Sequence, residues 1–74
     1  MIQSNIEHDL VLLSAAELAR VLGTSTRTVW RLLAAGRLPQ PVRVGAQPRW
    51  PADELRAWIK AGMPPAERWE ESRV

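Results

Sequence analysis

The 74-residue sequence contains no cysteine and only one histidine, His8. Without cysteine there is neither a disulfide framework nor a thiolate zinc site, and one histidine cannot build a metal cluster. No apolar run approaches the roughly 20 residues of a membrane span, and residues 1–9 lack the basic and apolar regions of a signal peptide. We therefore expect a soluble, cytoplasmic protein with no metal, no cofactor and no membrane partner.

The usual components of a catalytic site are also missing. His8 lies in a mostly polar segment, and no glycine-rich phosphate loop is present. Asp53 and Glu54 are neighbours on a predicted helix, so they do not face each other as a catalytic carboxylate pair would. A chain of this length builds one hydrophobic core without a cofactor-sized cavity. We expect no catalytic residue, no enzymatic activity and no small-molecule ligand.

Acidic residues are absent from the middle of the chain. Between Leu18 and Ala52 there is no aspartate or glutamate, but there are six arginines, namely Arg20, Arg27, Arg31, Arg37, Arg43 and Arg49. This separation concentrates a positive field over the middle of the molecule, which favours a polyanionic partner. The alternative is an ordinary solvated surface, which usually mixes both signs of charge.

Two short helices are predicted in succession, over residues 15–22 and 26–35. The run Ser14 to Glu17 has the pattern of a capping box, and a glycine follows the first helix as its expected end. Ser25 is a good cap for the second helix. Because only three residues separate the helices, they must cross steeply, and Ala19 is small enough to allow close approach.

A hairpin and a third helix are predicted next. Residues 42–44 alternate as a strand, residues 45–48 form a turn, and residues 49–50 return antiparallel. We expect the arginines of this hairpin to face away from its valines and its tryptophan. The third helix covers residues 51–62, with proline in its first turn and glycine at its end.

These elements predict a mainly α protein with a small β-hairpin wing, a winged helix-turn-helix of three short helices and a two-stranded wing. Residues 1–10 are expected to form a flexible arm, residues 11–62 the DNA-binding domain and residues 63–74 a tail. For Trp69, in the tail, packing on the core, packing on a neighbouring molecule and exposure all remain open. The expected core is Leu13, Leu18, Val21, Leu22, Val29, Leu32, Leu33, Leu38, Val42, Val44, Trp50, Leu55, Trp58 and Ile59.

The start of the second helix is the candidate DNA-reading surface. A helix fits the major groove, and the N-terminal end of a recognition helix reaches base edges. Arginine can donate to two acceptors of guanine, so Arg27 or Arg31 is the best candidate for reading sequence. Trp30 beside them either covers the core edge or stacks against the DNA backbone. The expected contacts from this helix are Ser25, which also caps it, Thr26, Arg27, Thr28 and Arg31.

Three further candidates lie on the hairpin, namely Arg43, Gln47 and Arg49. A wing can follow the DNA backbone or enter the minor groove, and phosphate contact is the general expectation.

Several runs resemble the excisionase and AlpA-type regulator group, a minimal form of the MerR-like winged-helix DNA-binding domain. They are Leu12 to Ala19, Arg27 to Leu32, Gly36 to Pro39, Pro41 to Gly45, and the pair Arg49 and Trp50. The resemblance covers about residues 11–62. It implies that the recognition-helix role belongs to Ser25, Arg27, Thr28 and Arg31, and the wing role to Arg43, Gln47 and Arg49. Thr26 departs from the group, where proline or arginine is frequent at this position, and this leaves the fine specificity open.

The resemblance also implies a phage or prophage protein of the bacterial host cytoplasm. Such a protein directs an integrase toward excision by bending and coating attachment-site DNA, or it regulates transcription. Size favours cooperative self-association on DNA, because a single module buries only roughly 600–1,000 Å² there. A third hypothesis is an interaction adaptor that grips a protein with Trp69 and the acidic tail.

Overall fold

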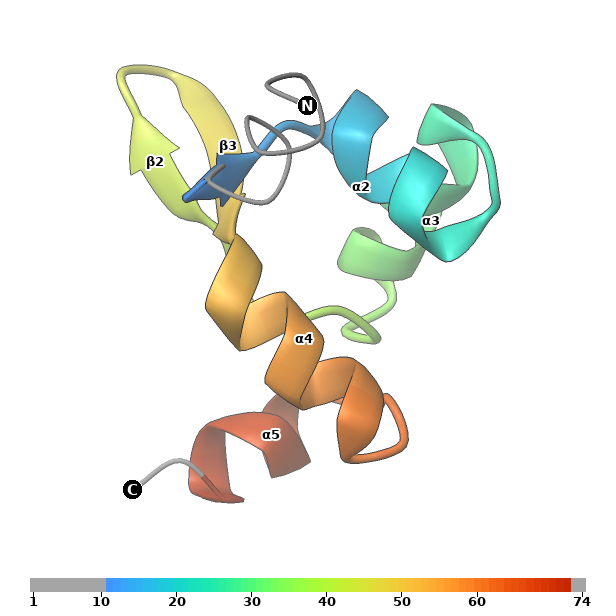
Figure 1. Cartoon of the computed structure of the whole chain (residues 1–74), viewed down its shortest axis with the longest axis vertical. Helices are drawn as coiled ribbons and strands as arrows, with labels where there is room; N and C mark the ends of the chain where they lie inside the picture. The colour runs from blue at the N-terminus through green and yellow to red at the C-terminus, as the bar shows by residue number, and fades with distance from the viewer. Residues whose placement is uncertain (1–10, 73–74) are drawn as a thin grey trace, which may run out of the picture.

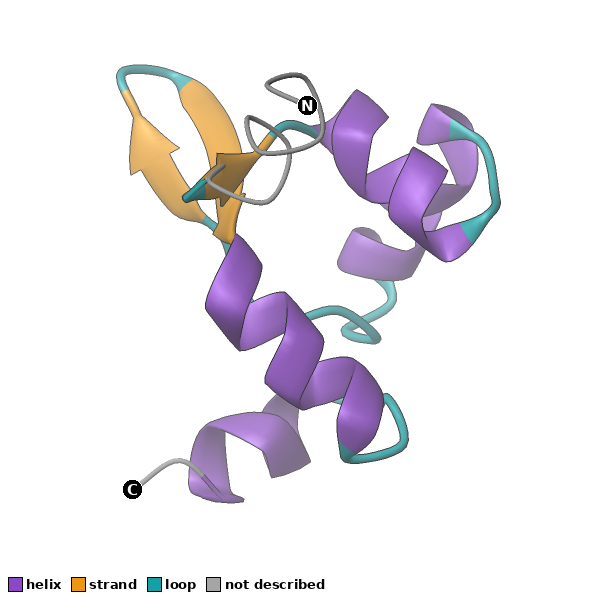
Figure 2. Cartoon of the chain, viewed as in Figure 1, coloured by secondary structure: helices purple, strands orange, loops and turns teal. Residues whose placement is uncertain are grey.

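The computed structural model describes residues 11–72, which form four helices and a three-stranded antiparallel sheet (Figures 1 and 2). The elements are β1 (Leu12–Leu13), α2 (Ala15–Leu22), α3 (Thr26–Ala34), β2 (Val42–Val44), β3 (Gln47–Pro51), α4 (Ala52–Lys60) and α5 (Ala66–Ser72). Helices α2 and α3 and the β2–β3 hairpin lie at one end of the molecule, and α4 leads from β3 to α5 at the other end (Figure 1). This architecture confirms the predicted winged helix-turn-helix. The arm predicted at residues 1–10 lies outside the described residues.

The predicted starts of the first two helices are confirmed at atomic detail. The backbone N–H of Ser14 donates to Glu17 Oε1 at 2.8 Å, and the N–H of Glu17 donates to Ser14 Oγ at 3.2 Å, which completes the capping box. Gly23 ends α2 with a φ of 70°, in the left-handed region that glycine adopts without strain. Ser25 Oγ accepts the N–H of Thr28 at 3.1 Å and caps α3. The tight turn between the helices thus follows from local chemistry.

The core lies where α2, α3, the sheet and α4 meet. Ala19 is 4% exposed, in agreement with the prediction that a small side chain lets α2 and α3 approach. The predicted core residues that the structure buries are Leu13, Leu18, Val29, Leu38, Trp50, Leu55 and Trp58, with Leu22, Leu32 and Leu33 partly buried against them. This single core positions the two helices relative to the sheet.

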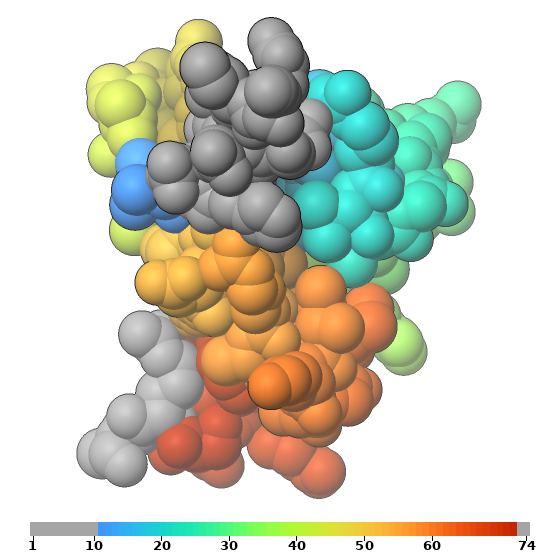
Figure 3. All heavy atoms as spheres, in the orientation of Figure 1, coloured from blue at the N-terminus to red at the C-terminus, as the bar shows by residue number. Residues whose placement is uncertain are grey.

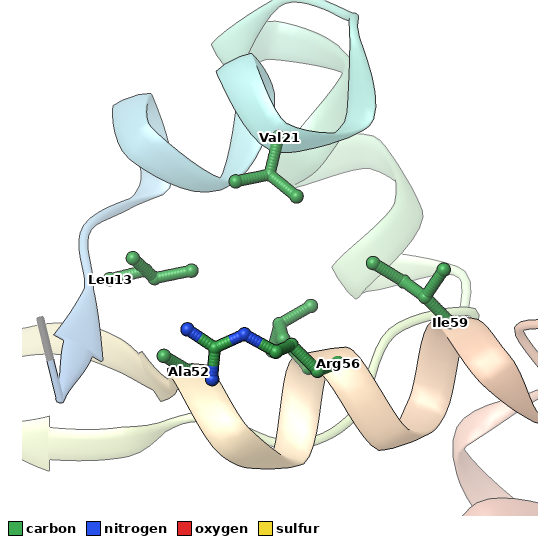
Figure 4. A pocket seen from close by; sticks show the side chains of 6 residues that line it. Leu13, Val21, Ala52, Arg56 and Ile59 are labelled. Carbon is green, nitrogen blue, oxygen red and sulfur yellow. The ribbon is translucent and has the colours of Figure 1, made fainter. Parts of the chain in front are cut away.

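Four predicted core residues are instead exposed, by 54% for Val21, 45% for Val42, 53% for Val44 and 38% for Ile59. The two valines of β2 lie on a hairpin that extends past the core, so their predicted burial is wrong. Val21 and Ile59 border a shallow hollow of about 130 Å³, together with Leu13. Figure 4 shows these three side chains pointing into it from β1, α2 and α4. The spacing of apolar residues along α2 and α4 predicts which residues share a face, but it cannot show that this part of the face borders a hollow.

The sheet contains one strand more than predicted. Residues 12–13, which precede the first predicted helix, pair with β3, which gives the strand order β1, β3, β2. Leu13 lies opposite Trp50, so the extra strand adds a buried side chain to the core face. A pairing this distant in sequence leaves no local signal.

The register of the hairpin corrects the predicted orientation of its arginines. The turn is only Gly45 and Ala46, so the following two residues belong to β3 and not to the predicted longer turn. Val42 lies opposite Arg49, and Arg43 lies opposite Pro48. Directly opposite residues project from the same face of an antiparallel pair. Arg49 therefore shares a face with the valines, and Arg43 shares a face with the tryptophan of β3, so the two arginines project from opposite faces.

The β3–α4 junction differs from the prediction by one residue. Pro51 is the last residue of β3 and the N-cap of α4, with a φ of −60° and a ψ of 130°, and it is not the first helical residue. The N–H of Ala52 donates to the carbonyl of Val11 at 2.8 Å, so the residue just before β1 supplies the acceptor at this helix start. Asp53 and Glu54 lie in the first turn of α4, where carboxylates are favourable.

Helix α5 was not predicted, and it decides the position of Trp69. The Trp69 side chain is 8% exposed, belongs to the core cluster, and donates its Nε1–H to Glu54 Oε2 at 2.9 Å. The N–H of Ala66 donates to the carbonyl of Gly36 at 2.9 Å, which ties the start of α5 to the chain just after α3. In the space-filling view α5 packs against α4 (Figure 3). Trp69 therefore packs on the core of its own chain.

Candidate nucleic-acid interface

Helix α3 carries four of the five residues predicted for the recognition helix, and the fifth, Ser25, is its N-cap. Ser25, Thr26, Arg27 and Arg31 are exposed, and Thr28 is half-buried. Ser25 Oγ, besides capping the helix, donates to Thr28 Oγ1 at 3.1 Å. The two hydroxyls thus form one local polar unit, and the two arginines form the longer projections of this face.

Both arginines of α3 have their guanidinium groups available. Arg27 and Arg31 are one helical turn apart and project opposite Val29, which is completely buried. Over residues 11–72 the one ion pair present joins Arg56 to Asp53 at 2.7 Å, so it does not involve α3. An unpaired guanidinium offers five N–H donors in a planar fork that matches guanine or phosphate acceptors. Burial of Val29 thus fixes the face of α3 from which these donors project.

The wing residues are distributed over two faces of the hairpin. Arg43 lies on the face of Trp50, whose ring centroid is 6.4 Å from that of Trp30 on α3, so this face is turned toward α3. On the opposite face Arg49 donates from Nη2 to Gln47 Oε1 at 2.7 Å and from Nη1 to the carbonyl of Pro48 at 2.8 Å. The structure thus brings Gln47 and Arg49 together and separates Arg43 from them.

Glu17 is the acidic residue closest in sequence to the arginine-containing stretch from Arg20 to Arg49, and its side chain forms part of the capping box of α2. The hydrogen bond from the Ser14 backbone holds the pKa of the Glu17 carboxyl below its usual value. The Ser14 hydroxyl and the positive charges of Arg20 and Arg49 lower the pKa further, while desolvation raises it. The carboxylate is therefore ionised at neutral pH and accepts hydrogen bonds at the start of α2.

Trp30 projects from α3 toward β3, and the sequence had left open whether it covers the core edge or faces the DNA. Its side chain is 42% exposed, and its ring lies 6.4 Å from the ring of Trp50 at an interplanar angle of 51°. One side of the indole therefore packs on the core edge while the rest faces solvent. The helical spacing had already placed Trp30 beside Arg27, but only the tertiary structure shows that its ring packs against Trp50 of β3.

No group of three or more histidine, cysteine, aspartate or glutamate residues comes together within residues 11–72. Asp53 pairs with Arg56, whereas Glu54 accepts a hydrogen bond from Trp69, so the neighbouring carboxylates have different partners. None of the helices over this range has the length and apolar composition needed to cross a bilayer.

Comparison with known proteins agrees with this geometry. Residues 12–63, from β1 to just beyond α4, match a family described as a helix-turn-helix domain. The chain belongs to this family. Membership supports sequence-specific binding of double-stranded DNA by this helix-turn-helix protein. Neither the curated proteins nor the solved structures contain a match. Helix α5 lies outside the matched range.

Proposed function

We propose that this helix-turn-helix protein is a phage or prophage excisionase, which binds attachment-site DNA and directs recombination toward excision. The observation that carries the DNA-binding step is the exposed, unpaired guanidinium pair of Arg27, in the first turn, and Arg31, in the last turn, on one face of the capped helix α3, beside a basic hairpin at the same end of the molecule. The excision step rests on the similarity of the sequence motifs to the excisionase and AlpA-type group.

In this proposal α3 enters the major groove and the wing follows the adjacent backbone or minor groove. Arg27 and Arg31 read base edges or bind phosphate, and Ser25, Thr26 and Thr28 add hydroxyl contacts near the helix start. Arg43 contacts the backbone segment beside α3, because it projects from the hairpin face that is turned toward this helix. Gln47 and Arg49 act together on the opposite side of the wing.

Several copies bind side by side and bend the DNA. One such module covers only roughly 600–1,000 Å² of surface on DNA, which is at the small end for a specific complex. Useful affinity therefore comes from contacts between neighbouring copies or from an integrase partner. A steep, concentration-dependent footprint over repeated sites would support this arrangement, and an isolated footprint without bending would contradict it.

The first experiment is a binding titration over a salt series, with DNA from the genomic neighbourhood of the gene and with random duplex. Each phosphate contact adds about −0.9 to the slope of log affinity against log salt. Arg31→Ala should weaken binding by about 1–3 kcal/mol if Arg31 reads a base, with relaxed preference at that position. Arg68→Ala is the matched control, because Arg68 is an exposed arginine on α5 at the other end of the molecule. Equal binding by both variants and the wild type would contradict the proposal.

A transcriptional regulator of the AlpA or MerR-like type would use the same DNA surface. An excision reaction reconstituted with the neighbouring integrase distinguishes the two roles. Stimulation of excision that Arg31→Ala abolishes would support the excisionase, whereas promoter binding without such stimulation would support the regulator.

The burial of Trp69 argues against the hypothesis of a protein-interaction adaptor. Trp69 was expected to grip a protein, but its side chain is 8% exposed and its indole N–H is bound to Glu54. The exposed residues of α5 that remain are mainly charged. A loss of function in Arg31→Ala with retained function in Arg68→Ala would exclude this hypothesis.

A further inference from the structure

The four tryptophans of the chain fall into two groups. Three bury the ring and donate the indole N–H to a protein oxygen; they are Trp50 to the Pro39 carbonyl at 2.9 Å, Trp58 to the Pro64 carbonyl at 2.8 Å and Trp69 to Glu54 at 2.9 Å. Trp30 differs on both counts. Its side chain is 42% exposed, and its indole N–H has no hydrogen-bond partner among residues 11–72.

The position of Trp30 indicates what this indole would meet. On the helical wheel it lies about 60° from Arg27, on the edge of the exposed face of α3 that points toward Trp50 of β3. The wing face turned toward this edge also carries Arg43. Where α3 meets β3 there is therefore a half-exposed indole whose N–H has no partner among residues 11–72, with Arg27 beside it on α3 and Arg43 on the wing face turned toward α3.

DNA geometry determines which part of the ligand would lie against Trp30. When a recognition helix occupies the major groove and a wing the adjacent minor groove, the phosphodiester strand between the two grooves crosses the space between helix and wing. An indole N–H is a donor without an acceptor function, and phosphate oxygens are acceptors. The apolar ring matches the deoxyribose, which has no charge.

We propose that Trp30 is a direct DNA-backbone contact, whose indole N–H donates to one phosphate oxygen of the strand between α3 and the wing while the ring packs on the adjoining sugar. The inference rests on the proposed DNA binding of α3 and assigns a phosphate hydrogen bond to Trp30, for which the sequence left core packing and backbone stacking open. Trp30 also holds α3 at a defined distance from β3 through its contact with Trp50. It therefore links the recognition helix to the wing where both meet the same strand.

The test compares wild type with Trp30→Phe on a specific duplex. Phenylalanine keeps an aromatic ring against Trp50 but removes the N–H donor, so affinity should fall about tenfold, as for the loss of a hydrogen bond to a charged group. The slope of log affinity against log salt should stay unchanged, because tryptophan carries no charge. Arg27→Ala, in contrast, should lower affinity and make this slope shallower.

A scan of single methylphosphonate substitutions identifies the contacted phosphate. Wild type should lose most affinity at one central phosphate, and Trp30→Phe should lose clearly less at that same position, since the two changes remove the same hydrogen bond. A purely structural role would leave the two losses additive at every phosphate. Urea denaturation of wild type and Trp30→Phe without DNA shows whether the variant is as stable as wild type. The affinities are then compared at temperatures where both proteins are folded.

Fluorescence provides an independent measure with the same protein. Because the other three tryptophans are buried, acrylamide should quench mainly Trp30, and specific DNA should protect it. If wild type binds no DNA, the proposed function itself fails. If wild type binds specifically but Trp30→Phe binds equally well, with additive methylphosphonate losses and no protection from acrylamide, this inference alone is overturned.

Discussion

Replacement of Trp69 measures how far α5 belongs to the folded domain. The side chain is 8% exposed, packs in the core cluster and donates a hydrogen bond to Glu54. Truncation of a buried tryptophan to alanine costs about 3–5 kcal/mol. A chain of 74 residues has a total stability of roughly 4–11 kcal/mol, at about 0.05–0.15 kcal/mol per residue. Trp69→Ala should therefore remove a large part of the free energy of unfolding.

The assay is thermal denaturation followed by circular dichroism. Each kcal/mol lowers the Tm of a domain of this size by roughly 4–8 °C, so Trp69→Ala should melt at least about 12 °C below wild type. Trp69→Phe keeps an aromatic ring but loses the hydrogen bond to Glu54, so its Tm should lie between those of wild type and Trp69→Ala. Trp30→Phe is the control, because its side chain is half-exposed and makes no hydrogen bond among residues 11–72. A Tm within about 4 °C of wild type for Trp69→Ala would refute the docking of α5 on the core.

Three smaller predictions concern local features. Ser25→Ala should lower the free energy of unfolding by about 0.5–2 kcal/mol in urea denaturation, because α3 loses the cap that binds the Thr28 N–H. Glu17→Gln should be less stable than wild type at pH 7, and the difference should disappear in acid. Because folding lowers the pKa of Glu17, the ionised carboxylate stabilises the folded protein at pH values above the unfolded pKa. This stabilisation is lost as the pH falls through the folded pKa. Gly36→Ala should cost about 1–2 kcal/mol in the same urea assay, since φ is 72° and a Cβ meets no atom within 4 Å, so the cost is backbone strain.

Each of these predictions has its own control. Ser25→Gly should cost only a few tenths of a kcal/mol, so equal losses for glycine and alanine would show that the Ser25 hydroxyl is not the source of the effect. For Glu17→Gln, a constant difference from pH 7 down to about pH 2 would contradict a role for the ionised carboxylate. Gly36→Asn should cost less than Gly36→Ala, since asparagine tolerates the left-handed region better. The reverse order would argue against backbone strain.

The helix-turn-helix was predictable because its determinants are close together in sequence. The capping box at Ser14, the cap at Ser25 and the small Ala19 each act within one helical turn or at one helix crossing. The exposed face of α3 followed from the same logic, since burial of Val29 fixes the opposite face by the helical period. The residues proposed to read DNA could therefore be chosen before any tertiary contact was known.

The incorrect predictions of burial depend on contacts between distant segments, whereas the errors in the hairpin arginines and at the β3–α4 junction concern local register. Val42 and Val44 have a strand pattern, but whether that strand lies over the core depends on where the hairpin projects. The opposite faces of Arg43 and Arg49 depend on a two-residue turn and its register. Val21 fits the period of α2 but borders a hollow, because packing between helices sets which part of the stripe is covered.

By itself, the sequence determined the succession of α2, α3, the hairpin and α4, the steep turn between α2 and α3, and a basic face that suits a polyanion, because these depend on residues within a few positions of each other. Only the tertiary structure decided that residues 12–13 complete the sheet, that Trp69 is part of the core, and that Trp30 of α3 packs against Trp50 of β3. Those three features require segments far apart in the chain to meet, and the free energy of such contacts comes from burial and pairing that no local pattern encodes.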